Sequence, residues 1–366
     1  MTDVDRNGVG ERFRRSSTLT LHWEGAGLQA TNWLTHSVAP LPALCVPMLA
    51  ALTEWRSAPE VLARCPELDS LESTTQLLTL LADASLLDRA SEPRRDLSVW
   101  APWSPAAAAF HFATKGGSYP DDLVAYEEVL RAKAVVEPPP PACKKIAGNR
   151  TRLASTDAAS PITTTLQQRR TWRNFGTGGL QREALEGLLF HTWGVQAWGH
   201  VPGQGRIPLK TSPSGGARHA IEAYVAVLDV AGLEPGWYHY DAEANELVGV
   251  RNGCQPDDLV HCLAGQDYFR GAAAAIFMCP VFARAMWRYP FSRAYRAVLI
   301  EAGHLGQSFC LLATEMGLAP FSTMAFRETE IETILGLDGV AECPIYVVGV
   351  GSQAADRRQH PGEISG

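Results

Sequence analysis

Apolar and polar positions follow strand and helix periods in two separate stretches of the chain. In the first stretch a short alternating pattern breaks at a glycine turn and gives way to clusters of apolar residues at helical spacing. This order predicts a small α+β module of the winged-helix type at 17–95, after a polar and flexible N-terminus at 1–16. The predicted elements are two strands at 17–25 and 28–38 and three helices at 43–55, 57–65 and 70–87, the second helix with Ser57 as its N-cap.

The second stretch, from residue 160 to the end, carries longer and more apolar elements. In 292–317 the apolar side chains recur at i, i+3, i+4 and i+7, which predicts a long amphipathic helix that ends at Gly317. The run AAAAIFMCPVFA is apolar throughout and predicts a strand buried on both faces. The other predicted elements are a helix at 180–195, a strand at 221–230, a hairpin at 236–250 and a last strand at 343–351. The domain is therefore expected to be α+β with a mixed sheet flanked by helices.

The segment at 96–159 differs from both stretches and is expected to connect them. It contains the aromatic and Pro-punctuated run WAPWSPAAAAFHF, a helical stretch, and four consecutive prolines in VEPPPP. A run of prolines is extended and stiff, so it acts as a spacer. We place the main domain boundary between this segment and the second domain at 160–366.

Charge and composition argue against several classes of function. With 46% hydrophobic and 19% charged residues the chain has the composition of a soluble globular protein. Its net charge of −7 argues against nucleic acid or an anionic membrane as the main partner. The N-terminus has charges but no apolar core, so no signal peptide is predicted and a cytoplasmic location is expected.

The cysteines offer no metal site. The sequence has eight of them, none in a CxxC pair, and several stand in apolar runs. Such cysteines are expected to be buried thiols. Glu301 and His304 are spaced i, i+3 on the long helix, with Gln307 a further three residues on, but no HExxH pattern completes a metal site.

Two segments of the second domain have the residue types that bind an anionic or heteroaromatic ligand. The first is QQRRTWRNF, where Arg169, Arg170 and Arg173 stand with Thr171; guanidinium groups bind phosphate in bidentate fashion, although a solvated basic face has the same composition. The second is the turn Pro213-Ser214-Gly215-Gly216. Missing side chains there let a ligand approach the backbone, although a simple loop before a strand has the same sequence.

The third candidate is the dipeptide Arg288-Tyr289, just before the predicted long helix. Tyrosine transfers a proton only when its pKa is lowered, and an adjacent cation is one way to lower it. Two interpretations remain: a proton-transfer pair, or a tyrosine packed at the end of a strand beside an arginine in solvent.

Together these segments resemble a known family. RRTWRNF resembles the RR[ST]xRxF motif of the nitroreductase-like flavoproteins. SPSGGARHAIEAYV, GLEPGWYHYD, YRAVLIEAGHLGQS and LGLDGVAECPIYVVGVG resemble, in this order, the SagB-type dehydrogenase branch. That branch contains FMN-dependent oxidases that convert azolines to azoles in ribosomal peptide natural products. The resemblance covers about 160–351, and residues 17–95 resemble more loosely the peptide-clamp winged-helix module of some members.

The resemblance implies a homodimer that binds FMN, and it implies roles for individual residues. Arg169, Arg170, Thr171 and Arg173 would contact the FMN phosphate and ribityl chain. Pro213, Ser214, Gly215 and Gly216 would lie against the flavin. Ser322 and Thr323, in the loop after the long helix, would approach flavin N5 and the pyrimidine edge. Arg357 and Arg358 are the nearest equivalents of basic residues that lie near the phosphate in many members.

The chain departs from the azoline-oxidising members at one position. Those members carry a Lys-Tyr pair where this sequence has Arg288-Tyr289. Arginine stays protonated and cannot shuttle a proton, so Tyr289 is the candidate proton-transfer residue of the pair. Arg288 can still hold Tyr289 toward phenolate or bind a substrate carboxylate.

Three functions remain open at this point. The first is an FMN-dependent dehydrogenase acting on a peptide or peptide-derived natural product, with the front module binding the peptide or a biosynthetic partner enzyme. The second is an NAD(P)H-dependent nitroreductase or quinone reductase acting on small aromatics, which needs neither the front module nor the proline spacer. The third is a scaffold with a degenerate flavin domain.

Overall fold

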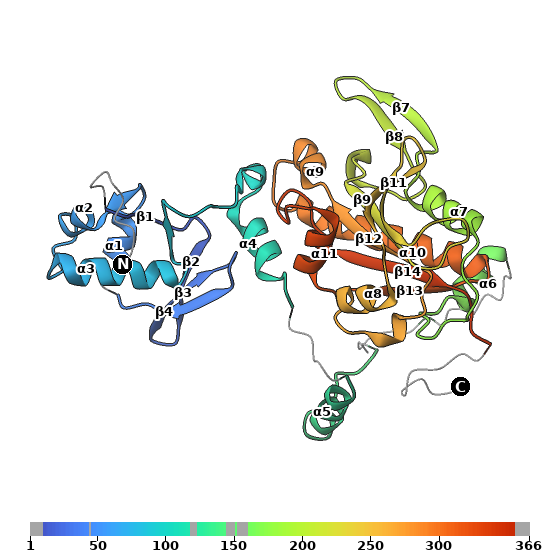
Figure 1. Cartoon of the computed structure of the whole chain (residues 1–366), viewed down its shortest axis with the longest axis horizontal. Helices are drawn as coiled ribbons and strands as arrows, with labels where there is room; N and C mark the ends of the chain where they lie inside the picture. Colours follow the sequence, from blue (N-terminus) through green and yellow to red (C-terminus); the bar gives the residue numbers. More distant parts are fainter. Residues whose placement is uncertain (1–9, 44, 118–122, 144–150, 152–159, 356–366) are drawn as a thin grey trace. The chain divides into compact units, whose positions relative to one another are not determined.

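The computed structural model describes residues 10–43, 45–117, 123–143, 151 and 160–355, and its chain divides into two compact units. Unit 1 comprises residues 1–115 with 290–293, and unit 2 comprises 116–289 with 294–366. The division falls inside the segment expected to connect the two domains. Figure 1 shows the elements of each unit.

Unit 1 contains the expected short strands and helices. Two three-stranded antiparallel sheets, in the orders β5-β1-β6 and β2-β3-β4, accompany the helices. Residues 12–15, expected to be part of a flexible N-terminus, instead form the central strand β1, because β5 and β6 pair with it on both sides. The elements are β1 (Arg12–Arg15), β2 (Leu19–Glu24), β3 (Gly27–Asn32), β4 (Ser37–Pro40), α1 (Cys45–Ala51), β5 (Arg56–Ser57), α2 (Ala58–Leu62), α3 (Leu71–Asp83), β6 (Leu87–Arg89), η1 (Ser98–Trp100) and α4 (Pro105–Ala113).

The helix starts of unit 1 follow the sequence closely. Helix α2 begins after Ser57, whose backbone N–H donates to Glu60 Oε2 at 2.7 Å. Helix α3 begins after Ser70, whose hydroxyl accepts from the backbone N–H of Ser73 at 3.2 Å. These side chains satisfy backbone groups that have no partner inside the helix.

Unit 2 is built around a six-stranded sheet in the order β11-β10-β9-β12-β14-β13. The expected α+β class is confirmed. The sheet itself is antiparallel at each of these pairings rather than mixed, because hairpins and helical crossovers return the chain in alternate directions. The elements are α5 (Leu123–Val136), α6 (Pro161–Gln168), α7 (Arg182–Trp193), β7 (Ala197–Val201), β8 (Gly205–Leu209), η2 (Gly215–Ala217), β9 (Ile221–Val227), β10 (Gly236–Asp241), β11 (Glu246–Asn252), α8 (Pro256–Cys262), η3 (Asp267–Phe269), β12 (Ala274–Pro280), α9 (Phe282–Arg288), α10 (Ala294–Glu315), β13 (Ala319–Thr323), α11 (Glu328–Leu335) and β14 (Tyr346–Gly351).

Helices cover both faces of this sheet. Side chains of α8 and α11, such as Leu259 and Ile331, join one core cluster with Phe277 of β12. On the opposite face α10 lies so close to β14 that a Cβ at Gly306 would come within 2.6 Å of the Tyr346 ring. The strands alternate between these two cores, which explains their near-continuous apolar sequences.

Helix α10 is long and apolar enough to cross a membrane by length and composition. Its apolar stripe, including Val298, Leu305 and Phe309, is buried in unit 2 instead. Gly317 follows it with φ +69°, as expected for the residue that ends a helix. The predicted amphipathic helix is therefore the central core helix of this unit.

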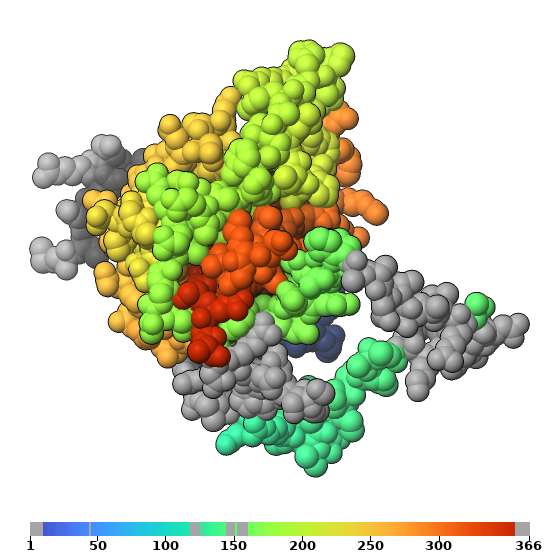
Figure 2. Space-filling model, turned by 90° about the vertical axis from the view of Figure 1, so that its right-hand side faces the viewer, coloured from blue at the N-terminus to red at the C-terminus, as the bar shows by residue number. Residues whose placement is uncertain are grey.

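The β7–β8 hairpin extends away from the rest of unit 2, as Figures 1 and 2 both show. Its residues are mostly exposed or half-buried, and the Arg206 guanidinium stacks at 3.7 Å over the Trp198 ring. This hairpin was not predicted, because Gly and Pro interrupt the alternation of apolar and polar residues in AWGHVPGQGRIPL.

Candidate active site

Arg288 and Tyr289 lie at the end of a helix, not of a strand. Strand β12 ends at Pro280 and α9 begins at Phe282, so the last residues of the predicted strand are helical. Proline has no N–H to continue a strand ladder, and FARAMWR is rich in good helix formers. Arg288 is the last helical residue and is exposed; its guanidinium carbon lies 5.8 Å from the centre of the half-buried Tyr289 ring. The expected strand end was therefore wrong, whereas the exposed Arg288 and the half-buried Tyr289 agree with the rest of the packing interpretation.

The structure brings the glycine turn and Tyr289 together. Gly216 has φ +60°, and a Cβ added there would lie 2.8 Å from the Tyr289 hydroxyl oxygen and 3.2 Å from Cγ of Arg288. A Cβ at Gly215 would lie 3.6 Å from the same ring. Two features that the sequence identified separately thus form one contact, and glycine is required at 216 both by its φ and by this contact.

The turn is strained and held in place from outside. Ala217 and His219 also have positive φ, at 51° and 42°, which costs of order 1–2 kcal/mol each for residues other than glycine. The Ser214 hydroxyl accepts from the His219 N–H at 2.8 Å and donates to Glu301 Oε2 at 2.5 Å. Arg284 of α9 donates to the His219 carbonyl oxygen at 3.1 Å. Helices α9 and α10 therefore fix the shape of the turn.

Glu301 and His304 both contact the turn. Glu301 is buried, and burial raises its pKa. His304 Nδ1 lies 3.2 Å from the carbonyl oxygen of Pro213. Within the described ranges no group of three His, Cys, Asp or Glu side chains could hold a metal ion. The cysteines are buried thiols as expected, except for the exposed Cys143.

The arginine cluster follows the helix that contacts the C-terminal end of α10. It follows α6, and the backbone N–H of Trp172 donates to the Pro320 carbonyl of β13 at 2.9 Å. Arg170 donates to two backbone carbonyls and lines a cavity of about 620 Å³. Arg169, Arg170 and Arg173 form no ion pair with a carboxylate among the described residues. Thr171 is half-buried between them.

Ser322 and Thr323 lie at the end of a strand rather than in a loop. They belong to the edge strand β13, opposite Val348 and Val347 of β14, which supply the pairing that the sequence alone did not reveal. The Thr323 hydroxyl contacts the Gln266 side chain at 3.2 Å, and the Tyr268 hydroxyl donates to Gln266 Oε1 at 2.7 Å.

This chain of contacts reaches the arginine cluster. The Arg173 guanidinium carbon lies 5.8 Å from the centre of the Tyr268 ring. The candidate residues thus form two groups beside one helix. The turn contacts Tyr289 and also the part of α10 near Ala297 and Glu301. The arginine cluster follows α6, from which Thr165 donates to Glu315 at the end of α10.

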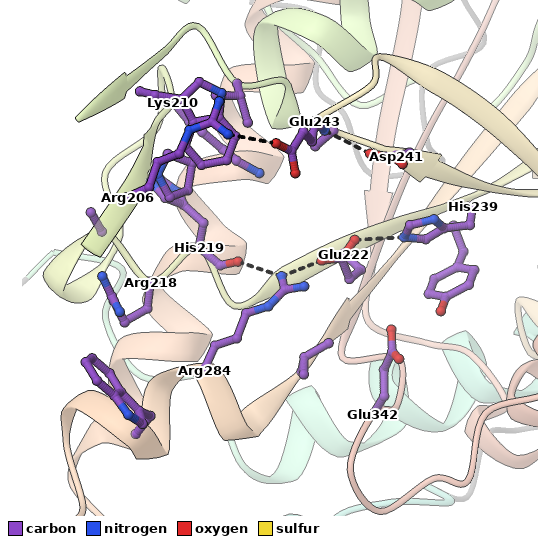
Figure 3. A pocket seen from close by; sticks show the side chains of 18 residues that line it. Arg206, Lys210, Arg218, His219, Glu222, His239, Asp241, Glu243, Arg284 and Glu342 are labelled. Atoms are coloured by element: carbon purple, nitrogen blue, oxygen red, sulfur yellow. Dashed lines mark hydrogen bonds and ion pairs between the residues drawn. The ribbon is translucent and has the colours of Figure 1, made fainter. Parts of the chain in front are cut away.

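A charged pocket of about 690 Å³ adjoins the turn. This pocket was not predicted from the sequence. The end of β8, the turn, β9 and α9 all contribute to its walls, as Figure 3 shows. We call it the charged pocket; its lining includes Lys210, Arg218, His219, Glu222, Arg284 and Trp287. One signal was present: Glu222 is a single charge inside the apolar run IEAYVAVL.

Ionic contacts set the charges in this pocket. Burial alone would raise the pKa of Glu222, but a hydrogen bond with His239 Nε2 at 2.7 Å and an ion pair with Arg284 lower it to about 2. The same hydrogen bond raises the pKa of His239. Burial lowers the pKa of His219 to about 4, so this side chain is neutral at physiological pH. The pocket therefore holds a carboxylate fixed between the Arg284 cation and the His239 ring.

Glu222→Gln is expected to lower the free energy of unfolding at neutral pH by about 2–3 kcal/mol. Because the folded pKa of Glu222 is depressed, its stabilisation is complete above the ordinary value of 4.5 and is lost as the pH falls toward 2. Urea denaturation at pH 7 and pH 3 measures the difference. The exposed Glu246→Gln of β11 is the control, and equal stability of the two variants would contradict the prediction.

Comparison with known proteins agrees with this geometry. The Nitroreductase family model matches residues 166–352, slightly more than half of the chain. The protein MJ1384 of Methanocaldococcus jannaschii, described as a nitroreductase, is 31% identical over 51% of this chain and 88% of its own length.

Two further relatives are named as processing proteins of trifolitoxin and of microcin B17. The trifolitoxin-processing protein TfxB of Rhizobium leguminosarum bv. trifolii is 35% identical over 36% of this chain and 37% of its own length. The microcin B17-processing protein McbC of Escherichia coli is 28% identical over 43% of this chain and 58% of its own length. The protein is thus similar to these two processing proteins, and it belongs to the nitroreductase family.

Proposed function

We propose that this protein is an FMN-dependent dehydrogenase that acts on a peptide or a peptide-derived natural-product intermediate. The observation that carries the proposal is the contact between the Tyr289 hydroxyl and the glycine turn, beside the charged pocket. The turn contacts Tyr289, and the residues that follow the turn line a pocket that also holds several cations. Strained backbone held by surrounding contacts is typical of functional sites.

The residues present fit FMN. A phosphate needs cations that carboxylates have not neutralised, and the described ion pairs include none of the three clustered arginines. Arg169, Arg170, Arg173 and Thr171 would hold the phosphate and ribityl chain. The turn at 213–216 would lie against the ring system, and Ser322 and Thr323 would approach its N5 and pyrimidine edge. Arg357 and Arg358 lie outside the described residues.

Bound FMN would supply the hydride acceptor for dehydrogenation. The chain's own residues must then accept the remaining proton and orient the substrate. The Tyr289 hydroxyl is at the turn and can relay a proton, whereas Arg288 stays charged. Arg288 lies beside the ring and can bind a substrate carboxylate.

Peptide substrates are favoured over small aromatics by two observations. TfxB and McbC are processing proteins of peptide products. Unit 1 adds a separate folded module, which a small-molecule reductase does not need. This module would bind the peptide or a biosynthetic partner enzyme, and we propose a cytoplasmic homodimer. A nitroreductase or quinone reductase driven by NAD(P)H is the alternative.

The test uses purified protein and a synthetic peptide with one thiazoline ring. FMN released on denaturation and a loss of about 2 Da from the peptide in aerobic buffer are expected. A colourless protein that does not take up FMN would contradict the cofactor. Rapid bleaching by NADPH with no change in the peptide would favour the reductase.

Arg169→Ala is expected to weaken FMN binding by about 10- to 100-fold, because a charge-assisted hydrogen bond to phosphate contributes about 1.5–3 kcal/mol. Titration of flavin fluorescence gives the dissociation constant. Arg182→Ala on α7, which removes an exposed arginine paired with Glu186, is the matched control. Equal FMN affinity of both variants would exclude Arg169 from the cofactor site.

A further inference from the structure

Arg218 links the glycine turn to the charged pocket. Its Nε donates to the Gly216 carbonyl oxygen at 3.0 Å, and its guanidinium carbon lies 5.2 Å from the centre of the Trp287 ring. Arg218 and Trp287 both line the charged pocket. Gly216 in turn contacts Tyr289, since a Cβ added at Gly216 would lie 2.8 Å from the Tyr289 hydroxyl oxygen. A single glycine therefore lies between the candidate proton-transfer group and this wall of the pocket.

Two cations of the pocket form no ion pair with a carboxylate among the described residues. They are Arg218 and Lys210, and Lys210 follows directly after β8. The two other arginines of the lining, Arg206 and Arg284, each form an ion pair with a glutamate. A carboxylate or phosphate is bound most strongly by cations that are not already neutralised. This wall of the pocket is therefore suited to an anionic ligand.

The carboxylates that face Lys210 are already held by other groups. They belong to Glu222 and Glu301. Glu222 forms an ion pair with Arg284, and Glu301 accepts a hydrogen bond from the Ser214 hydroxyl at 2.5 Å. Burial lowers the pKa of Lys210, and a bound anion would act against this shift and favour the ammonium.

The other charges of the pocket favour a peptide carboxylate over a phosphate. Four Lys or Arg side chains and four Asp or Glu side chains line the pocket. In Figure 3 Arg218 lies at one side, and Asp241 and Glu243 lie toward the other. These carboxylates would repel a doubly charged phosphate, whereas a peptide carboxylate has one charge and the peptide N–H groups can donate to them. The Trp198 and Trp287 rings add apolar area for the side chains of a peptide.

We propose that the charged pocket binds a carboxylate of the peptide, close to the residue that is oxidised; this rests on the proposed function. Nε of Arg218 stays on the Gly216 carbonyl, and the two terminal amino groups of Arg218 donate to the carboxylate, with Lys210 as the second cation. The carboxylate belongs either to an acidic side chain or to the C-terminus of the peptide. The chain thus selects acidic substrates by a site separate from the hydroxyl that transfers the proton.

Three thiazoline peptides test this preference on the FMN-loaded, full-length protein. The first has Asn on both sides of the ring and an amidated C-terminus, and the second has Asp in both places. The third is neutral in its side chains and ends in a free carboxylate one residue after the ring. At least one acidic peptide is expected to have a KM about 10- to 100-fold below that of the first peptide, because its carboxylate forms charge-assisted hydrogen bonds.

Two variants assign this preference to the pocket. Lys210→Gln and Arg218→Gln are each expected to lower the ratio of neutral to acidic KM by about tenfold. Both peptides meet the same variant, so a disturbance of the turn cancels in the ratio. The side chains come from different elements, so one variant remains informative if the other does not fold. Lys133→Gln on α5 and Arg182→Gln on α7 are exposed controls and should keep the wild-type ratio.

Equal KM values for acidic and neutral peptides on the wild-type protein would overturn the proposal. So would a preference that persists in both pocket variants and disappears in Arg288→Gln, because Arg288 would then be the carboxylate anchor. FMN-bound protein that leaves all three peptides unchanged would instead refute the proposed function, and binding alone then tests the pocket.

Isothermal titration calorimetry with the same peptides measures binding without turnover. The acidic peptide is expected to bind about 10- to 100-fold more tightly than the neutral one, and Lys210→Gln should reduce this difference. Equal affinities would overturn the proposal. Tighter binding of NADP⁺ than of NAD⁺, lost in Lys210→Gln and without any preference for the acidic peptide, would mark a phosphate site of a reductase and would overturn it as well.

Discussion

Tyr289→Phe is expected to keep FMN bound and to slow turnover of the thiazoline peptide by about 10²- to 10⁴-fold. The substitution removes only the hydroxyl oxygen, so the ring remains against Gly215 and Gly216. The proton from the substrate can then no longer pass to an oxygen at this position. Single-turnover kinetics of flavin reduction by the peptide measure the chemical step without product release.

The control for this variant is Tyr126→Phe on the exposed surface of α5. Both proteins should bind FMN with equal affinity, and only Tyr289→Phe should lose activity. If Tyr289→Phe turns over at the wild-type rate, Tyr289 has no part in proton transfer and its contact with the turn is only packing.

Gly216→Ala is expected to have the second-largest effect. Its φ of +60° costs alanine about 1–2 kcal/mol of stability. In addition, the new Cβ would lie 2.8 Å from the Tyr289 hydroxyl, so the ring must move. A displacement near 1 Å in a catalytic group lowers the rate by about 10²-fold. Thermal unfolding and kcat measured on the same preparation give both effects.

Gly232→Ala separates the two effects. Gly232 has φ +72°, and a Cβ there would meet nothing within 4 Å. It should lose similar stability to Gly216→Ala and keep its activity. Equal loss of activity in both variants would mean that general destabilisation, not displacement of Tyr289, is the cause.

Local patterns predicted most elements whose partners lie in the same helix or hairpin, but not the β7–β8 hairpin, where Gly and Pro break the alternation. The stripe of α10 and the alternation of β2 and β3 are properties of neighbouring residues, and both appear in the structure. Strands β1 and β13 were not predicted, because each forms only by pairing with strands far away in the sequence. Strand β1 pairs with β5 and β6, and β13 pairs with β14. The apolar run that was predicted as one strand continues into 282–288, where the chain forms helix α9 instead.

The same distinction applies to the candidate site. The arginine cluster, the glycine turn and Tyr289 are visible as motifs, and the contact between the last two was found in the structure. The sequence does not identify Lys210 as a pocket residue, because a single lysine before Thr and Ser is typical of the surface. Its burial arises only when β9, α9 and α10 pack around it.

Helix α10 also determines where this chain can change in length during evolution. It contacts the turn through Glu301 and holds α6 through Glu315, fourteen positions later. One inserted residue between them would rotate one contact by about 100° relative to the other and lengthen the helix by about 1.5 Å. Homologues should therefore conserve the number of residues in this interval, whereas the open tip of the β7–β8 hairpin at Gly203 can accept insertions.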